Sequence, residues 1–252
     1  MATSHRLIGS GSRKVLALHG WFGSAAGWGS LPQYLDTDTY TWAFLDYRGY
    51  GEAKEHAGEH TMEEISDDAL SLADELGWDT FDLVGHSMGG MAVQRVLLDA
   101  PERVRRLVGI SPVPASGVPF DERSWALFSG AAGNRENRAA IIDLTTGNRL
   151  SRTFVDAVVQ HSLDESTVEA FGDYLTAWAK TDFADKLQGN ETPVKVLVGE
   201  NDPAMSADVM RQTWLQTYPS CELEVLTNAG HYAMFETPVA LVTSVEEFLG
   251  RP

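Results

Sequence analysis

A serine with a glycine two residues before it and another two residues after it lies in the segment Gly85–Gly89 (GHSMG). The preceding run, Phe81–Val84, is typical of a buried strand and the following residues are typical of a helix, so we expect a sharp strand-to-helix turn. Glycines at the two flanking positions leave the room that such a turn needs, and the turn lifts the Ser87 hydroxyl above the sheet edge. A hydroxyl presented in this way can attack a carbonyl carbon. We therefore predict that Ser87 is a nucleophile.

Attack on a carbonyl creates negative charge on its oxygen, which backbone N–H donors must stabilise. The helix after Ser87 directs its first N–H groups at this position, and we assign one donor to Met88. The second donor should come from a glycine-bracketed turn beside the nucleophile, and His19–Gly23 (HGWFG) is such a turn. We assign this donor to the N–H of Trp21 and interpret His19 as a residue that shapes the turn.

His231 is predicted to be the general base. It lies in Asn228–Tyr232 (NAGHY), between the last predicted strand and the final helix. Loops at the carboxyl ends of strands are where the active sites of parallel sheets gather. His86 is adjacent to the serine in sequence, but the turn should direct its side chain elsewhere.

A carboxylate that orients the histidine is expected at the end of the preceding strand, where Glu200 and Asp202 are the candidates. We prefer Asp202, because Gly199 turns the chain away from the strand and Pro203 fixes the loop that follows. Glu200 is expected to be a solvated turn residue. The resulting Ser–His–Asp arrangement requires no cofactor and no metal ion.

A second cluster of chemically capable residues is the acidic stretch bounded by His56 and His60. A metal site there is conceivable, since histidine and carboxylate are zinc ligands. A solvated loop is the simpler interpretation, and we expect that.

The framework that positions these residues is predicted from alternating strand and helix patterns, which indicate an α/β fold with a mostly parallel sheet covered by helices on both faces. Most of the predicted strands are continuous apolar runs, as expected for strands buried on both faces. An additional short edge strand is predicted at His5–Ile8. The six main strands are expected at Val15–Leu18, Thr41–Leu45, Phe81–Val84, Arg106–Ile110, Val194–Val198 and Leu223–Leu226.

The alternation stops between residues 112 and 189, where only helical patterns are found. We interpret residues 112–189 as a helical insertion, here called the inserted segment, into a core domain formed by 1–111 and 190–252. Its helices are predicted over Asp121–Ala131, Arg135–Gly147, Ser151–Leu163 and Thr167–Thr181.

Composition narrows the classes of partner. The 252 residues carry a formal net charge of −17, which disfavours nucleic acids and anionic membrane surfaces, so a small-molecule partner is expected. No apolar stretch approaches the roughly 18 residues of a membrane span, and the N-terminal residues do not resemble a secretory signal. The single cysteine, Cys221, has no intramolecular disulfide partner. A cytoplasmic location is expected, and the sequence does not indicate the oligomeric state.

Taken together, these motifs resemble those of the α/β-hydrolase superfamily, in its branch of small capped esterases and lactonases. The pattern is similar to that of pimeloyl-carrier esterases, enol-lactonases and carbon–carbon bond hydrolases. The resemblance covers nearly the whole chain outside the inserted segment, which it identifies as a cap. An aspartate in place of Ser87 would indicate a dehalogenase or an epoxide hydrolase. The matching segments are His19–Trp21, Asp46–Gly51, Gly85–Gly90, Gly199–Asp202 and Gly230–His231.

The resemblance implies a serine hydrolase that cleaves a carboxylic ester or lactone of a small, largely apolar molecule through an acyl-enzyme. Aromatic side chains are candidates to line its pocket, namely Phe22, Trp125, Phe128, Phe154 and Trp178. One arginine of the inserted segment could instead bind a substrate carboxylate, although a solvated helix face is expected for each; these arginines are Arg123, Arg135, Arg138, Arg149 and Arg152.

Three alternatives remain open at this point. The same triad could perform acyl transfer or carbon–carbon bond cleavage. The fold could support a cofactor-independent oxygenase in which the histidine–aspartate pair is the base. The chain could also be a small-molecule receptor with a vestigial hydrolase site, because a fold and a motif do not fix the reaction.

Overall fold

A computed structural model describes residues 4–251, in which seven strands form one sheet in the order β1-β3-β2-β4-β5-β6-β7. β1 pairs antiparallel with β3, and all other pairs are parallel. The α/β prediction is confirmed, and every predicted strand is present with one or two additional residues. The strands are β1 (His5–Gly9), β2 (Arg13–Leu18), β3 (Tyr40–Leu45), β4 (Phe81–His86), β5 (Val104–Ile110), β6 (Val194–Gly199) and β7 (Cys221–Leu226).

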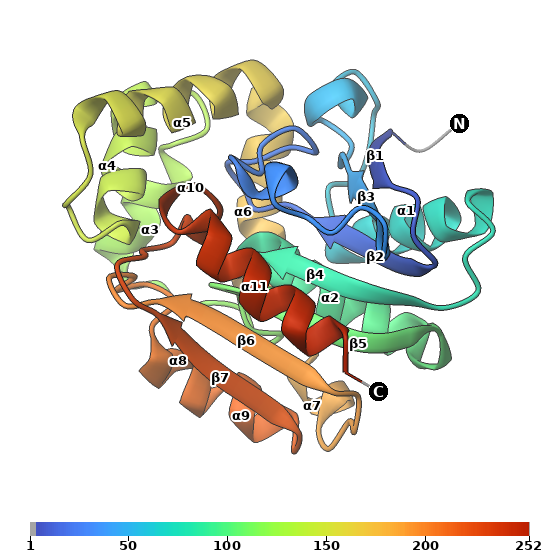
Figure 1. Ribbon diagram of the computed structural model, residues 1–252. Coiled ribbons are helices and arrows are strands. Elements are labelled where there is room, and N and C mark those ends of the chain that lie inside the picture. The colour runs from blue at the N-terminus through green and yellow to red at the C-terminus, as the bar shows by residue number, and fades with distance from the viewer. Residues whose placement is uncertain (1–3, 252) are drawn as a thin grey trace.

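Helices cover both faces of this sheet (Figure 1). Helix α11 crosses the near face, whereas α2, α8 and α9 lie behind the sheet, and α1 packs beside α2. Every residue of β3, β4 and β6 is buried, which explains why these strands are mostly apolar. The charged exceptions, Asp82 and Lys195, form ion pairs with Arg105 and Glu224. These elements are α1 (Met62–Glu75), α2 (Met88–Asp99), α8 (Ala207–Gln212), α9 (Trp214–Thr217), α10 (Ala233–Glu236) and α11 (Pro238–Leu249).

The inserted segment runs from β5 to β6 and contains five helices: α3 (Glu122–Ser129), α4 (Arg135–Thr145), α5 (Arg152–Glu165), α6 (Val168–Lys180) and α7 (Ala184–Leu187). The first four begin at a side chain that accepts a hydrogen bond from a backbone N–H three residues later, at Asp121, Asn134, Ser151 and Thr167. Helix α7 was not predicted, because four residues are too few to show a helical period. Figure 1 shows α3, α4 and α5 beyond the carboxyl ends of β4 and β6.

Within residues 4–251, no helix combines the length and the apolar character that crossing a membrane requires.

Candidate active site

The turn that carries Ser87 is held in a sparsely populated backbone conformation. Ser87 has φ of 53° and ψ of −118°, between the last residue of β4 and the first residue of α2. A β-carbon on Gly85 would lie 2.2 Å from the carbonyl oxygen of Gly89, and one on Gly89 would lie 2.0 Å from that of Leu18. The close approach of these backbones is therefore possible only with glycine, as the sequence pattern suggested.

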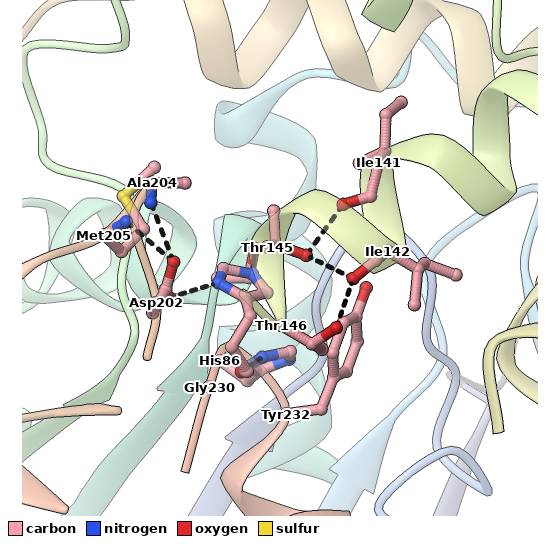
Figure 2. Close-up of polar contacts among 12 residues, drawn as sticks. His86, Ile141, Ile142, Thr145, Thr146, Asp202, Ala204, Met205, Gly230 and Tyr232 are labelled. Carbon is pink, nitrogen blue, oxygen red and sulfur yellow. Dashed lines mark hydrogen bonds and ion pairs between the residues drawn. The ribbon is translucent and has the colours of Figure 1, made fainter. Parts of the chain in front are cut away.

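The structure brings the side chains of Ser87, His231 and Asp202 into one hydrogen-bonded chain. Nε2 of His231 lies 2.9 Å from Oγ of Ser87, and Nδ1 lies 2.7 Å from Oδ2 of Asp202. The other carboxylate oxygen of Asp202 accepts from the N–H groups of Ala204 at 2.9 Å and Met205 at 3.0 Å (Figure 2). These contacts fix the carboxylate, and the carboxylate in turn fixes the imidazole plane.

Asp202 is suited to remain ionised. Burial by itself would raise the pKa of this carboxyl group, but the neighbouring His231 and the N–H groups of Met205 and Ala204 outweigh burial, so that the pKa lies below its usual value. An ionised Asp202 accepts the Nδ1 proton of His231. In the neutral imidazole, Nε2 is then the acceptor for the Ser87 hydroxyl proton.

Glu200, the alternative acid, is directed elsewhere. Its side chain is exposed, and its Oε2 accepts from the backbone N–H of Asn228 at 3.0 Å. Glu200 therefore stabilises the loop before His231, and Asp202 is the carboxylate that contacts the imidazole.

The two histidines nearest the proposed nucleophile and oxyanion turn have structural contacts. Nε2 of the buried His86 lies 2.9 Å from the backbone oxygen of His231, and burial, aided by the charge of His231, lowers the pKa of His86 to about 3. His19 is also buried, with its Nδ1 2.8 Å from the carbonyl oxygen of Gly20 and its ring 3.9 Å from that of Tyr47. Burial lowers the pKa of His19 to about 3 as well, so both rings are neutral at pH 7.

Within residues 4–251, the backbone N–H groups of Trp21 and Met88 donate to no protein acceptor. Met88 is the first residue of α2, where a helix leaves its N–H groups without partners. The turn around Trp21 is braced, because its carbonyl accepts from the Tyr50 hydroxyl at 2.9 Å and its indole N–H donates to the carbonyl of Phe171 at 2.7 Å.

A cavity of about 210 Å³ opens beside Ser87 and His231, and its wall is mainly apolar. Of the aromatic residues predicted to line a pocket, Phe22, Phe128 and Trp178 are part of this wall. Among the described residues, no arginine, lysine, aspartate or glutamate lines it. The prediction omitted several other lining residues, which have no sequence signal of their own: Val113, Val118, Phe120, Ile141, Met205 and Tyr232.

Trp125 and Phe154 lie outside this cavity, contrary to expectation. On α3 the residues facing the cavity are Ser124 and Phe128, four positions apart, so the adjacent Trp125 points about 100° away. The Trp125 ring lies near the surface, where the Lys180 ammonium is 4.1 Å from its centre.

Phe154 belongs to a second cavity, of about 200 Å³, between α5 and the loop after β2. On α5, Phe154, Ala157 and His161 face this second cavity with helical spacing. The two cavities share the wall residues Phe22, His86 and Tyr232.

Arg138 corrects the expectation that the arginines of the inserted segment are solvated. Its guanidinium is buried, donates to the carbonyls of Ala131 and Ala132 at 3.1 and 2.8 Å and to the Ser162 hydroxyl at 2.9 Å, and lies 3.5 Å from the centre of the Phe171 ring. Burial lowers its pKa to about 10, so it remains charged at pH 7. It ties the helices of the inserted segment together and does not line the cavity beside Ser87.

His60 is a second correction, since it is buried and not part of a solvated loop. Its Nδ1 lies 2.9 Å from Oδ2 of Asp173 on α6, which links the core to the inserted segment. Across residues 4–251, no group of three or more histidine, cysteine, aspartate or glutamate side chains is arranged to hold a metal ion.

Comparison with known proteins shows the family. The family model described as the alpha/beta hydrolase fold matches residues 14–238. The chain belongs to this family. The resemblance inferred from the sequence motifs is thereby confirmed for the alpha/beta hydrolase fold.

Two curated relatives illustrate the range of activities within the alpha/beta hydrolase family. One is a 2-hydroxy-6-oxononadienedioate/2-hydroxy-6-oxononatrienedioate hydrolase from Paraburkholderia phymatum, 26% identical over 260 residues, which cover 96% of this chain and 89% of the relative. Another is a non-heme haloperoxidase from Rhodococcus erythropolis, 27% identical over 238 residues, which cover 88% of this chain and 86% of the relative.

The solved structure of a hydrolase from Oleispira antarctica superposes with a TM-score of 0.88, at 17% identity, covering 100% of this chain and 96% of that one. This likeness shows the shared fold.

Proposed function

We propose that this alpha/beta hydrolase cleaves a carboxylic ester or lactone of a small, largely apolar molecule through an acyl-enzyme on Ser87. The observation that carries the proposal is the unbroken hydrogen-bonded chain from Ser87 through His231 to Asp202. Ser87 and His231 line a mainly apolar cavity, in which a substrate would bind.

The chemistry follows from the contacts. His231 takes the Ser87 proton through Nε2 while Oγ attacks the carbonyl carbon, and Asp202 stabilises the imidazolium. The N–H groups of Trp21 and Met88 would bind the oxyanion, and losing one donor of this kind typically costs about 2.7–4 kcal/mol of transition-state stabilisation. The imidazolium protonates the departing alcohol oxygen. Water, activated by the same His231 nitrogen, then hydrolyses the acyl-serine.

The cavity wall favours an uncharged substrate. A carboxylate moved from water into an apolar pocket without a cationic partner loses several kcal/mol of solvation. The described residues around the cavity include no arginine or lysine that could pair with a carboxylate. An apolar acyl chain therefore fits this site better than an acid.

Carbon–carbon bond hydrolysis is the second candidate, because the relative from Paraburkholderia phymatum is named as a hydrolase of 2-hydroxy-6-oxo dioates. The compounds in that relative's name are dioates, which carry two carboxylates at neutral pH. A cavity wall without arginine or lysine argues against a substrate of that charge here, so we rank ester cleavage first.

The test is hydrolysis of p-nitrophenyl esters from acetate to octanoate, run beside labelling with a fluorophosphonate. We expect turnover, labelling at Ser87 and an optimum at one chain length. Labelling without turnover on any ester would favour a carbon–carbon or acyl-transfer substrate. Absence of both would overturn the proposal and favour a cofactor-independent oxygenase or a receptor.

A further inference from the structure

The carboxylate of Glu236, at the end of α10, lies beneath the loop that carries His231. Its side chain is only 3% exposed. Oε2 accepts from the N–H of Gly230 at 2.8 Å, and Oε1 accepts from the N–H of Tyr232 at 3.1 Å. One side chain thus binds both peptide N–H groups that flank the imidazole-bearing residue.

Arg149, from the inserted segment, binds the same carboxylate. Its Nη2 donates to Oε2 of Glu236 and also to the backbone carbonyl of Asn228, at 3.0 Å. A carboxylate as buried as that of Glu236 is costly without a cation, since its lost solvation must be offset by a charged partner. Arg149 supplies that charge and reaches the His231 loop at a second point.

The backbone of His231 itself is also held on both sides. Its N–H donates to the carbonyl of Thr145 at 3.2 Å, and its carbonyl oxygen lies 2.9 Å from Nε2 of His86. The end of α4 lies against this loop, since a β-carbon on Gly230 would lie 3.3 Å from the carbonyl oxygen of Thr145. Thr145 is the last residue of α4, so the inserted segment contacts the loop through a carbonyl and, four residues later, through a guanidinium.

We propose that Glu236 and Arg149 are positioning residues, which hold the His231 imidazole within hydrogen-bond distance of both Ser87 and Asp202. The inference rests on the proposed function, in that it takes His231 as the general base. It also gives the inserted segment a role besides shaping the cavity: its arginine and the Thr145 carbonyl fix the loop that bears the base.

The position of the His231 imidazole is tightly constrained. Nδ1 and Nε2 of His231 lie 2.7 Å from Asp202 and 2.9 Å from Ser87, so the imidazole must make two hydrogen bonds at once and a shift of its backbone disturbs both. A displacement of about 1 Å caused by a change away from the reacting atoms can lower a rate by about 10²-fold. Neither Glu236 nor Arg149 lines the cavity, so their loss should not alter ground-state binding of substrate.

The experiment compares Arg149→Met, Arg149→Lys and the control Arg152→Met by kcat and KM on the best p-nitrophenyl ester. Arg149→Met removes the cation from a carboxylate that is only 3% exposed, so the melting temperature of each variant is measured beside its kinetics, and Arg149→Lys keeps the charge. Arg152 is a matched control, because it is a nearby arginine of the inserted segment whose partner is Asp156, one turn along the same helix. We expect Arg149→Met to lower kcat about 10-fold with KM changed less than about two-fold. Arg149→Lys should retain most of the wild-type kcat, and Arg152→Met should have the wild-type kcat.

Glu236→Gln provides the second arm. The glutamine amide has one acceptor oxygen for two N–H groups, and its NH₂ group would face a donor, so kcat should fall further than in Arg149→Met. If Glu236→Gln does not fold, the Arg149 series decides alone. Wild-type kcat in a folded Arg149→Met, or a change confined to the melting temperature, would overturn the inference while leaving the proposed function intact. An inactive and unlabelled wild type would instead refute the proposed function.

Discussion

The Ser87 hydroxyl oxygen lies 2.9 Å from Nε2 of His231, although the two residues are 144 positions apart in the chain. The Ser87 hydroxyl is half-buried at the carboxyl end of β4. The His231 imidazole belongs to the loop after β7, and β7 lies three strands away from β4 in the sheet. This contact is the basis of the first prediction.

Replacing Ser87 with alanine should abolish fluorophosphonate labelling and lower kcat at least about 10³-fold, because no other nucleophile faces His231 Nε2 in the described structure. The variant should fold, since alanine removes one oxygen and adds no bulk to the turn. Kinetics and intact-protein mass spectrometry measure the two effects. Ser124→Ala, which changes another serine of the cavity wall, is the control and should retain activity. Substantial turnover by Ser87→Ala would contradict the nucleophile assignment.

Asp202→Asn should lower kcat at least about 10²-fold, because an amide in place of the carboxylate can favour the wrong imidazole tautomer and no longer stabilises the imidazolium. The comparison is Glu200→Gln, which alters an exposed carboxylate that binds the Asn228 N–H. We expect Glu200→Gln to stay within about two-fold of wild type. If Glu200→Gln were the damaged variant and Asp202→Asn the active one, the assignment of the acid would be reversed.

The free energy of unfolding should fall as the pH is lowered from 6.5. His19 and His86 have pKa values near 3 in the folded protein, against 6.5 in the unfolded chain. Between these values the unfolded chain binds more protons, so each histidine contributes a loss of about 1.4 kcal/mol per pH unit, and its contribution is complete above pH 6.5.

Urea titrations at pH 7.5, 6.5 and 5.5 measure this dependence above the range in which most carboxylates titrate. His86→Gln should give a shallower decline than wild type. Equal free energies of unfolding at pH 7.5 and 5.5 would show that the two buried rings take up protons without cost.

Val118→Phe should move the optimal acyl chain to a shorter length, because the larger ring fills part of the 210 Å³ cavity beside Ser87. Ala157→Phe is the matched change in the adjacent 200 Å³ cavity. We expect it to leave the acyl optimum unchanged. The measurement is kcat/KM over p-nitrophenyl acetate to octanoate. A shift caused by Ala157→Phe alone would place the acyl chain in the second cavity.

Short-range sequence signals determined much of the fold and of the candidate site. Mostly apolar runs predicted the inner strands, because a strand buried on both faces is largely apolar. The edge strands β1 and β7, which are only partly buried, were predicted as well. The positions of Ser87 and His231 followed from local features: the glycines required by a tight turn, and a loop at the end of the last strand. These requirements act within a few residues, so they are visible in the sequence.

Contacts between distant segments were decided only by the tertiary structure. Arg149 and Glu236 are 87 positions apart, and neither has a local feature that pairs it with the other. The same holds for the cavity wall, where Ser124 on α3 faces the cavity and the next residue, Trp125, has its ring near the surface. Which side of a helix faces a ligand depends on how that helix packs, and packing is a property of the whole fold. The sequence therefore determined the reactive groups, and the tertiary structure decided what holds and surrounds them.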